Sequence, residues 1–214
     1  MLELGLKVLI SYLLGSLNGS LIIGRLRGVD IRTMGSGNPG GTNALRTQGK
    51  WFAFWVMVID VGKGWLPAWL LPVLAIPAVG LDAEISRTWL TLACAAGAVV
   101  GHCYPVWFGF AGGKGAATAI GALLVIAPAV LIPALAVWVA VLIGTGFVGL
   151  ATIGAAWSMP AYLVLTNSRG NADALVFLLL FASFILFTHR DNIQRMRDGE
   201  ENRIERVMLL RRTH

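Results

Sequence analysis

The stretch that decides the fold covers residues 115–168 and reads GAATAIGALLVIAPAVLIPALAVWVAVLIGTGFVGLATIGAAWSMPAYLVLTNS. It contains no Asp, Glu, Lys, Arg or His. Because an α-helix rises about 1.5 Å per residue, a single helix of this stretch would be about 80 Å long, against a hydrocarbon core of about 30 Å. The stretch therefore predicts several consecutive transmembrane helices, with breaks expected at 128–133, at 144–149 and at Pro160.

The composition of the whole chain indicates the same class. Of its 214 residues, 57% are hydrophobic and 13% are charged, and the mean hydropathy is +0.73. Soluble domains carry about 25% charged residues. These values exclude a disordered chain, a coiled coil, a disulfide scaffold and an ordinary soluble domain. The net charge of +6 would suggest nucleic-acid binding in a soluble protein, but the cytoplasmic loops of membrane proteins collect Lys and Arg. We therefore expect no nucleic-acid partner.

The two cysteines do not suggest a covalent or metal framework. On a helix, nine residues place Cys94 and Cys103 about 13 Å apart, too far for a disulfide. No run of His, Cys, Asp and Glu has the spacing of metal ligands, so we expect no metal ion and no other cofactor.

Loop charges predict the topology. Further apolar runs cover 8–24, 51–80, 88–111 and 174–188. Residues 25–50, Lys114 and the Arg-rich tail after His189 suit the cytoplasm, whereas the acidic loop 81–87 and residues 167–173 suit the outside. An odd number of crossings must then lie within 115–168, and three fit. We expect an all-α polytopic membrane protein with seven transmembrane helices, or six if one is re-entrant. The N-terminus is expected outside and the C-terminus in the cytoplasm.

The predicted domain organisation is simple. A single integral membrane domain is expected to cover residues 1–214, and within it residues 190–214 form a charged cytoplasmic tail.

A first polar segment lies just after the first apolar run and reads GSGNPGGTN over 35–43. Glycines with hydroxyl and amide neighbours leave backbone N–H groups able to bind an oxyanion, and a helix beginning near Thr42 would add its dipole. Asn43 and Arg46 would then share a face of that helix. A flexible capped turn is the alternative, but the guanidinium of Arg46 favours phosphate binding.

Two more segments carry charge within or beside apolar runs. Asp60 and Lys63 are three residues apart, and we expect a structural ion pair that supports the site rather than direct chemistry. The segment FAGGKGAAT, residues 110–118, places Lys114 and free amides at the head of an apolar helix, which is typical of a phosphate site. It is not a Walker A loop, because Gly115 follows the Lys. The alternative is a cytoplasmic lysine in a tight turn.

A fourth segment begins at the end of the last apolar run. His189, Asn192 and Arg195 recur every three residues and are expected to share a helical face, although helix capping and membrane-surface electrostatics are alternatives. Together the four segments indicate a membrane enzyme that handles phosphorylated, lipid-linked substrates at the inner leaflet. An organophosphate transporter of the inner membrane is the alternative function, and a structural membrane subunit is a third.

These segments resemble the signatures of the bacterial acyl-phosphate:glycerol-3-phosphate acyltransferases, in the same order. The resemblance covers residues 15–200 and departs from the family at Asn18, Gly41 and Ala111, where Pro, Ala and Lys are usual. The matching segments are GSLNGSLIIGRL, GSGNPGGTNALR, DVGKG, GHCYPVWFGFAGGKGAAT and HRDNIQRMRDGEE.

The resemblance implies a multi-pass enzyme of the bacterial inner membrane with its active site on the cytoplasmic side. The sn-1 hydroxyl of glycerol 3-phosphate would attack an acyl phosphate, giving 1-acylglycerol 3-phosphate and phosphate for phospholipid biosynthesis. The substrates and the bilayer are the implied partners, and a soluble enzyme that makes acyl phosphate is a further one. The expected catalytic residues are Ser36, Lys114, His189 and Asn192. The expected substrate-binding residues are Gly35, Gly37, Asn38, Thr42, Asn43, Arg46, His102, Gly112, Gly113, Gly115 and Thr118.

Overall fold

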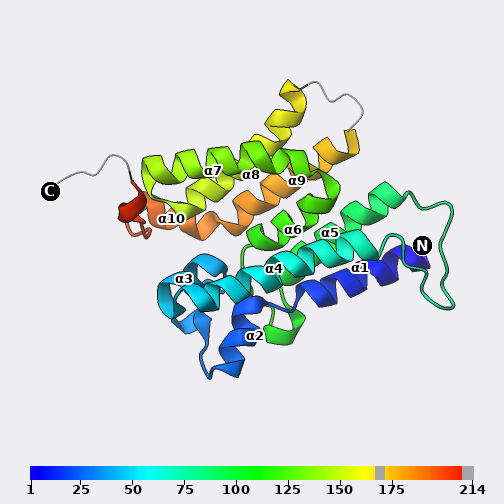
Figure 1. Cartoon of the computed structure of the whole chain (residues 1–214), viewed down its shortest axis with the longest axis horizontal. Coiled ribbons are helices and arrows are strands. Elements are labelled where there is room, and N and C mark those ends of the chain that lie inside the picture. The colour runs from blue at the N-terminus through cyan, green and yellow to red at the C-terminus, as the bar shows by residue number, and fades with distance from the viewer. Residues whose placement is uncertain (167–171, 209–214) are drawn as a thin grey trace. The chain divides into compact units, whose positions relative to one another are not determined.

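The computed structural model describes residues 1–166 and 172–208, and this part of the chain is helical without a β-strand (Figure 1). The all-α prediction is confirmed. The chain forms two compact units, Met1–Ile126 and Ala127–His214, and each is described separately. The single domain predicted over residues 1–214 stays a prediction.

The first unit is built around α4, which packs against α3, α5 and α6, while α1 packs along α5. In this unit α2 and α3 lie at the end away from the N-terminus (Figure 1). Its elements are α1 (Leu2–Gly15), α2 (Gly19–Leu26), η1 (Ile31–Thr33), α3 (Gly41–Gln48), α4 (Lys50–Leu70), α5 (Arg87–Cys103), η2 (Val106–Phe108) and α6 (Ala116–Ile126).

Glycines set how closely α4 and α6 approach. A Cβ on Gly64 of α4 would collide with the backbone oxygen of Thr118, and one on Gly121 of α6 would collide with the backbone oxygen of Val61. Small residues at such crossings let helix backbones touch, which is a main source of packing energy between helices in lipid.

The first apolar run, expected as one span over 8–24, contains a break between two helices. α1 ends at Gly15 and α2 begins at Gly19, with a bend of 47° between them. The side chain of Asn18 causes the restart, because it accepts a hydrogen bond from the amide of Leu21 at 3.2 Å and so caps α2. Lys7 is the residue before this run in the sequence. It lies inside α1, fully buried, with its Nζ 2.7 Å from Oε1 of Glu3.

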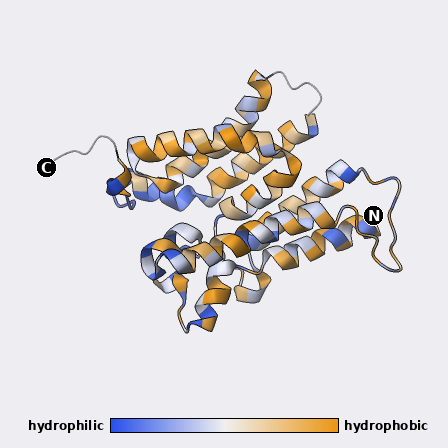
Figure 2. Ribbon diagram, viewed as in Figure 1, coloured by the Kyte–Doolittle hydropathy of each residue, from blue (hydrophilic) through white to orange (hydrophobic). Residues whose placement is uncertain are grey.

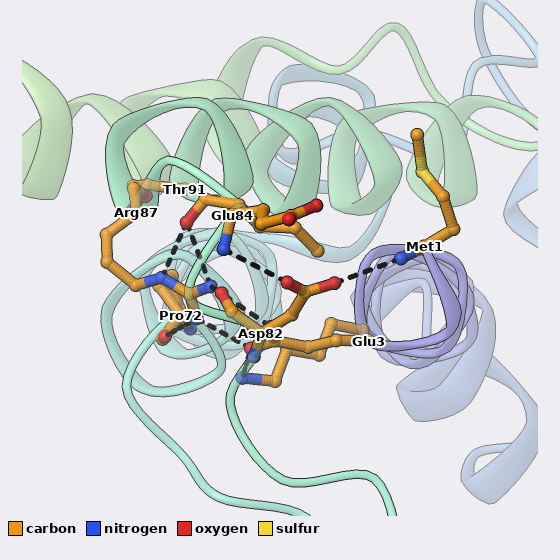
Figure 3. Close-up of polar contacts among 9 residues, drawn as sticks. Met1, Glu3, Pro72, Asp82, Glu84, Arg87 and Thr91 are labelled. Atoms are coloured by element: carbon orange, nitrogen blue, oxygen red, sulfur yellow. Dashed lines mark hydrogen bonds and ion pairs between the residues drawn. The ribbon is translucent and has the colours of Figure 1, made fainter.

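An ion network closes the N-terminal end of the first unit (Figure 3). The Glu3 carboxylate binds the Arg87 guanidinium through Oε1 and Oε2 at 2.6 and 3.0 Å, as well as Lys7. The N-terminal ammonium lies 3.2 Å from Oδ2 of Asp82. The Glu84 amide and this ammonium, both bound to the Asp82 carboxyl, lower its pKa. The network fastens the loop between α4 and α5 to the start of α1, and the sequence did not predict it.

The described residues of the second unit form three apolar helices and a polar segment that follows them. α8 packs against both α7 and α9. Figure 2 shows α7 apolar along its length and α10 polar. The elements are η3 (Pro128–Val130), α7 (Leu131–Thr145), α8 (Val148–Leu165), α9 (Ala172–Thr188), α10 (Arg190–Arg197) and η4 (Glu205–Val207).

Two of the three predicted breaks are confirmed in this unit. The chain breaks at Pro128 and again at Gly146, whose φ of 75° ends α7 in the left-handed region. The break expected at Pro160 is wrong, because Pro160 lies inside α8. Proline is tolerated within transmembrane helices because neighbouring groups satisfy the backbone carbonyl it leaves unpaired.

Among the residues that the structure describes, three helical segments are long and apolar enough to cross a membrane: Arg87–Phe108, Pro128–Thr145 and Val148–Leu165. The number rises to five if two bent pairs, α1 with α2 and α9 with α10, each form one span. α6 is a shorter apolar helix of 11 residues. α4 has 21 residues and carries Asp60 and Lys63. The chain is therefore a helical protein with three to five candidate membrane spans.

Candidate active site

Asn43 organises the first glycine-rich loop from within. Its Oδ1 accepts a hydrogen bond from the Ser36 amide at 3.0 Å, and its Nδ2 donates to the Met34 carbonyl at 2.9 Å. A Cβ on Gly35, whose φ is 56°, would collide with the Asn43 carboxamide oxygen. The side chain is 1% exposed. Asn43 therefore holds the loop in shape. The loop atoms that solvent can reach belong to residues other than Asn43.

Thr42 and Arg46 form the exposed face of α3. The helix begins at Gly41, which confirms the start expected near Thr42. Thr42 and Arg46 are four residues apart and both are exposed, whereas Asn43 is buried. Asn43 and Arg46 are three residues apart within α3, as expected, but only Arg46 is open to solvent. Arg46 shares its exposed side of the helix with Thr42, and Ser36, Gly37 and Asn38 in the preceding loop are partly exposed.

The second loop folds back onto the end of α5. The amide of Gly113 donates to the carbonyl of His102 at 3.1 Å, and the amide of Gly112 donates to that of Cys103 at 3.1 Å. The His102 ring lies so close to Gly113 that a Cβ there would collide with Nε2. Lys114 follows directly, partly buried, and α6 begins at Ala116 after Gly115, whose φ is 87°. The loop thus places a lysine immediately before a helix N-terminus.

The two loops lie at the same end of the first unit. The Arg32 guanidinium, just before the first loop, donates to the carbonyl of Phe108, just before the second, at 3.1 Å. Arg32 also binds the Asp30 carboxylate at 2.7 Å, and this contact lowers the pKa of Asp30. The predicted phosphate-binding segments of this unit are therefore neighbours in space.

The expected ion pair between Asp60 and Lys63 is confirmed, with 2.9 Å between Oδ1 and Nζ. It also reaches other elements, because Oδ1 accepts the Gly19 amide at 3.0 Å and Nζ donates to the Leu17 carbonyl at 3.2 Å. Nδ1 of His102 lies 3.5 Å from the same Oδ1. The pair therefore joins α4 to the break between α1 and α2 and to α5.

His102 and Thr118, both expected to bind substrate, are buried behind the second loop. His102 is 3% exposed, between Asp60 and Gly113, and Thr118 is fully buried against Gly64. Thr118 Oγ1 and Asp60 Oδ2 have no hydrogen-bond partner within the described chain. These positions suit residues that support the loop that carries Lys114. One feature of the sequence could have indicated these supporting roles. Asp60 lies within an apolar run, and a buried carboxylate needs more than one polar partner.

The last predicted segment gathers at the junction of α9 and α10. His189 is 5% exposed, and its Nδ1 lies 2.8 Å from the carbonyl oxygen of Ile185. A carbonyl only accepts, so Nδ1 carries a proton and Nε2 of a neutral ring carries the lone pair. Asn192 is 8% exposed, and its Nδ2 donates to Oε1 of Glu201 at 2.8 Å. Arg195 also binds Glu201, so the shared face of Asn192 and Arg195 is confirmed.

Metal ligands are not grouped in the described chain. Over residues 1–166 and 172–208, no three His, Cys, Asp or Glu side chains are placed to share an ion. Cys94 and Cys103 are both buried and free. Each unit holds one buried histidine among its described residues, His102 in the first and His189 in the second.

The amino-acid sequence of this chain is similar to those of proteins from one known family. The family described as glycerol-3-phosphate acyltransferase matches residues 5–199. The glycerol-3-phosphate acyltransferase of Aquifex aeolicus (strain VF5) is 37% identical over 196 residues, which cover 92% of this chain and 96% of that protein. The one from Geotalea daltonii is 38% identical, over 92% of this chain and 95% of that protein.

Solved structures agree with the sequence relatives. The crystal structure of PlsY (YgiH), an integral membrane glycerol 3-phosphate acyltransferase, in its glycerol 3-phosphate form aligns with a TM-score of 0.80. The identity is 35%, over 94% of this chain and 95% of that one. The lysophosphatidic acid form aligns at 0.77 with 34% identity, over 94% of both chains. The chain belongs to the glycerol-3-phosphate acyltransferase family of integral membrane proteins.

Proposed function

We propose that this chain transfers a fatty acyl group from acyl phosphate to the sn-1 hydroxyl of glycerol 3-phosphate, yielding 1-acylglycerol 3-phosphate and inorganic phosphate. Family membership makes it an acyltransferase that acts on glycerol 3-phosphate in phospholipid biosynthesis. The acyl phosphate donor is our extension. The observation that carries it is the pair of adjacent glycine-rich loops, one beside Arg46 and one ending in Lys114, which suits two phosphorylated substrates.

The proposed reaction asks for positioning and charge neutralisation. The sn-1 oxygen attacks the acyl carbonyl carbon, the bond from that carbon to the phosphate oxygen breaks, and the hydroxyl proton leaves with the released phosphate. Because a mixed anhydride is already activated, bound geometry and stabilisation of the leaving dianion supply most of the rate. We assign these tasks to exposed or partly exposed groups, namely Ser36, Asn38, Thr42, Arg46 and Lys114, and to the buried His189 and Asn192.

The buried members of the predicted set take supporting roles in this proposal. Asn43 fixes the first loop, while Asp60, Lys63, His102 and Thr118 lie behind the second. The glycines at 35, 37, 112, 113 and 115 supply backbone conformations rather than side chains, and the amides of Gly37, Gly112 and Gly113 hold the loops in shape.

An assay with purified protein distinguishes this function from transport of an organophosphate. With acyl phosphate and radiolabelled glycerol 3-phosphate, we expect labelled 1-acylglycerol 3-phosphate and inorganic phosphate in equal amounts. In sealed proteoliposomes a transporter would instead accumulate unmodified glycerol 3-phosphate, and that result without acylated product would overturn the proposal.

His189 is proposed to position a substrate hydroxyl or phosphate rather than to act as the general base, because phosphate itself can take the proton. Glutamine at this position keeps a hydrogen-bonding group without basicity, so His189→Gln is expected to retain activity within about tenfold of wild type. A general base contributes about 10²- to 10⁴-fold. Steady-state rates of His189→Gln and His189→Ala decide the matter. A loss in His189→Gln as large as that in His189→Ala would identify His189 as the base.

We further propose that seven segments cross the bacterial inner membrane and that the loops bearing Arg46 and Lys114 face the cytoplasm. The bent pair of α1 and α2 would form one crossing. The other six would be α4, α5, α6, α7, α8 and α9. The ion pair between the N-terminal ammonium and Asp82 supports this topology, because it joins two segments that the loop charges assign to the outside. An enzyme that makes acyl phosphate in the cytoplasm would then reach the site directly.

Single-cysteine labelling tests this topology. In a variant without Cys94 and Cys103, cysteines at positions 38, 114 and 194 are expected to be protected from an impermeant thiol reagent in intact cells. A cysteine at position 82 is expected to react. A cysteine at 168, also predicted outside, lies beyond the described residues. Labelling at 114 from outside would contradict the seven-helix count.

A further inference from the structure

Glu201 folds back onto the face of α10 that carries Asn192. The chain turns at Gly199, whose φ is 77°, and the amides of Glu200 and Glu201 donate to the Arg195 carbonyl at 2.8 and 3.1 Å. This turn brings the Glu201 carboxylate between two side chains. Its Oε1 accepts the Nδ2 group of Asn192 at 2.8 Å, and its Oε2 accepts Nε of Arg195 at 2.8 Å. The Glu201 side chain is 7% exposed, so the contact is shielded from water.

The segment after Glu201 is fixed to the turn between α7 and α8. The amide of Ile204 donates to the Gly146 carbonyl at 2.9 Å, and the Arg203 guanidinium lies 4.5 Å from the centre of the Phe147 ring. Glu201 is thus held by the chain on both sides. A carboxylate anchored in this way can orient its partners, because little freedom is left to lose when they bind it.

Asn192 is held from a second direction by α8. A Cβ on Gly149 would lie 3.0 Å from Cβ, Cγ and Nδ2 of Asn192, so the glycine provides the space in which the side chain sits. A carboxylate only accepts hydrogen bonds, so its contact with Nδ2 decides which end of the amide points toward Glu201. The carbonyl end of Asn192 is then directed away from Glu201. Oε2 meanwhile neutralises Arg195.

We infer that Glu201 is a positioning residue that fixes the amide orientation of Asn192 for acyl transfer. The inference rests on the proposed role of Asn192 in the reaction. Glu201 itself touches no reacting atom in this scheme, and its effect on catalysis passes through Asn192. Its removal therefore matters only while Asn192 is present.

A double-mutant cycle tests this coupling. We expect Glu201→Ala to lower kcat/KM for glycerol 3-phosphate by about 10- to 100-fold, the range for losing a hydrogen bond to a charged group. Glu201→Gln, which keeps an acceptor for Nδ2, is expected to recover most of the loss. Asn192→Ala is expected to be impaired, and adding Glu201→Ala to it is expected to cost no more than about twofold. Glu200→Ala removes an exposed neighbouring carboxylate and serves as the matched control, with unchanged kcat/KM.

The outcomes separate this inference from the proposal on which it rests. Wild-type kcat/KM in Glu201→Ala, or a full additional loss in the double variant, would overturn the positioning role even if Asn192→Ala is impaired. Wild-type activity of Asn192→Ala would overturn the proposed role of Asn192 and the inference with it. The melting temperature of each variant in detergent is the structural readout. A lower Tm for Glu201→Ala with no rescue by Glu201→Gln would also overturn the inference, because it would indicate a purely structural role.

Discussion

Lys114→Ala is expected to lower kcat/KM by about 30- to 4,000-fold, corresponding to about 2–5 kcal/mol for leaving a partly desolvated charge without its partner. Lys114 follows two glycines whose amides are tied to the end of α5, and it stands directly before α6. Lys114 is therefore two residues before the first residue of α6, and a helix N-terminus favours binding of a phosphate dianion. Steady-state kinetics with each substrate varied in turn measure the loss.

Lys50→Ala is the control for this prediction. Lys50 is an exposed cation at the start of α4, so its removal changes the net charge equally and should leave kcat/KM unchanged. Arg46→Lys keeps the charge on α3 but loses the planar fork that binds phosphate through two hydrogen bonds, and a large loss is expected there too. Near-normal KM and kcat for Lys114→Ala would remove Lys114 from the site.

The helices and several of their ends could be predicted from the sequence, because they depend on local patterns. The apolar stretch over 115–168 predicted several helices, and Pro128 and Gly146 marked two of the ends. The break after Gly15 was missed although Asn18 is a good N-cap, since it lies inside an apolar run that reads as one span. At Pro160 a break was expected but does not occur, because a helix packed among other helices tolerates proline.

Within the site, sequence spacing predicted which residue types gather but not which way they point. Asn43 and Arg46 are three residues apart, yet one is buried under the loop and the other is exposed. The contacts of Asp60 with Gly19 and His102 join residues about 40 apart in the sequence. The ion pair of Glu3 with Arg87 joins residues 84 positions apart in the sequence. Such contacts depend on tertiary packing, which no local pattern encodes.

Acyl phosphate is expected to be the only effective acyl donor. Many glycerolipid acyltransferases that use thioesters carry His-x₄-Asp, in which the carboxylate orients a histidine base in the manner of hydrolase triads. In this chain the fifth residue after His102 is Trp107, and after His189 it is Gln194. Nδ1 of His189 donates to the Ile185 carbonyl rather than to a carboxylate. A thioester alcoholysis without such a base would be slow, whereas phosphate is a leaving group that Lys114 and Arg46 can stabilise.

A donor-comparison assay tests the central claim most directly. Purified protein is incubated with radiolabelled glycerol 3-phosphate and acyl phosphate, acyl-CoA or acyl-carrier protein of the same chain length, and labelled 1-acylglycerol 3-phosphate is measured. We expect turnover with acyl phosphate alone, accompanied by release of one phosphate for each product molecule, and no product from the thioesters even at high concentration. Comparable turnover with acyl-CoA would contradict it.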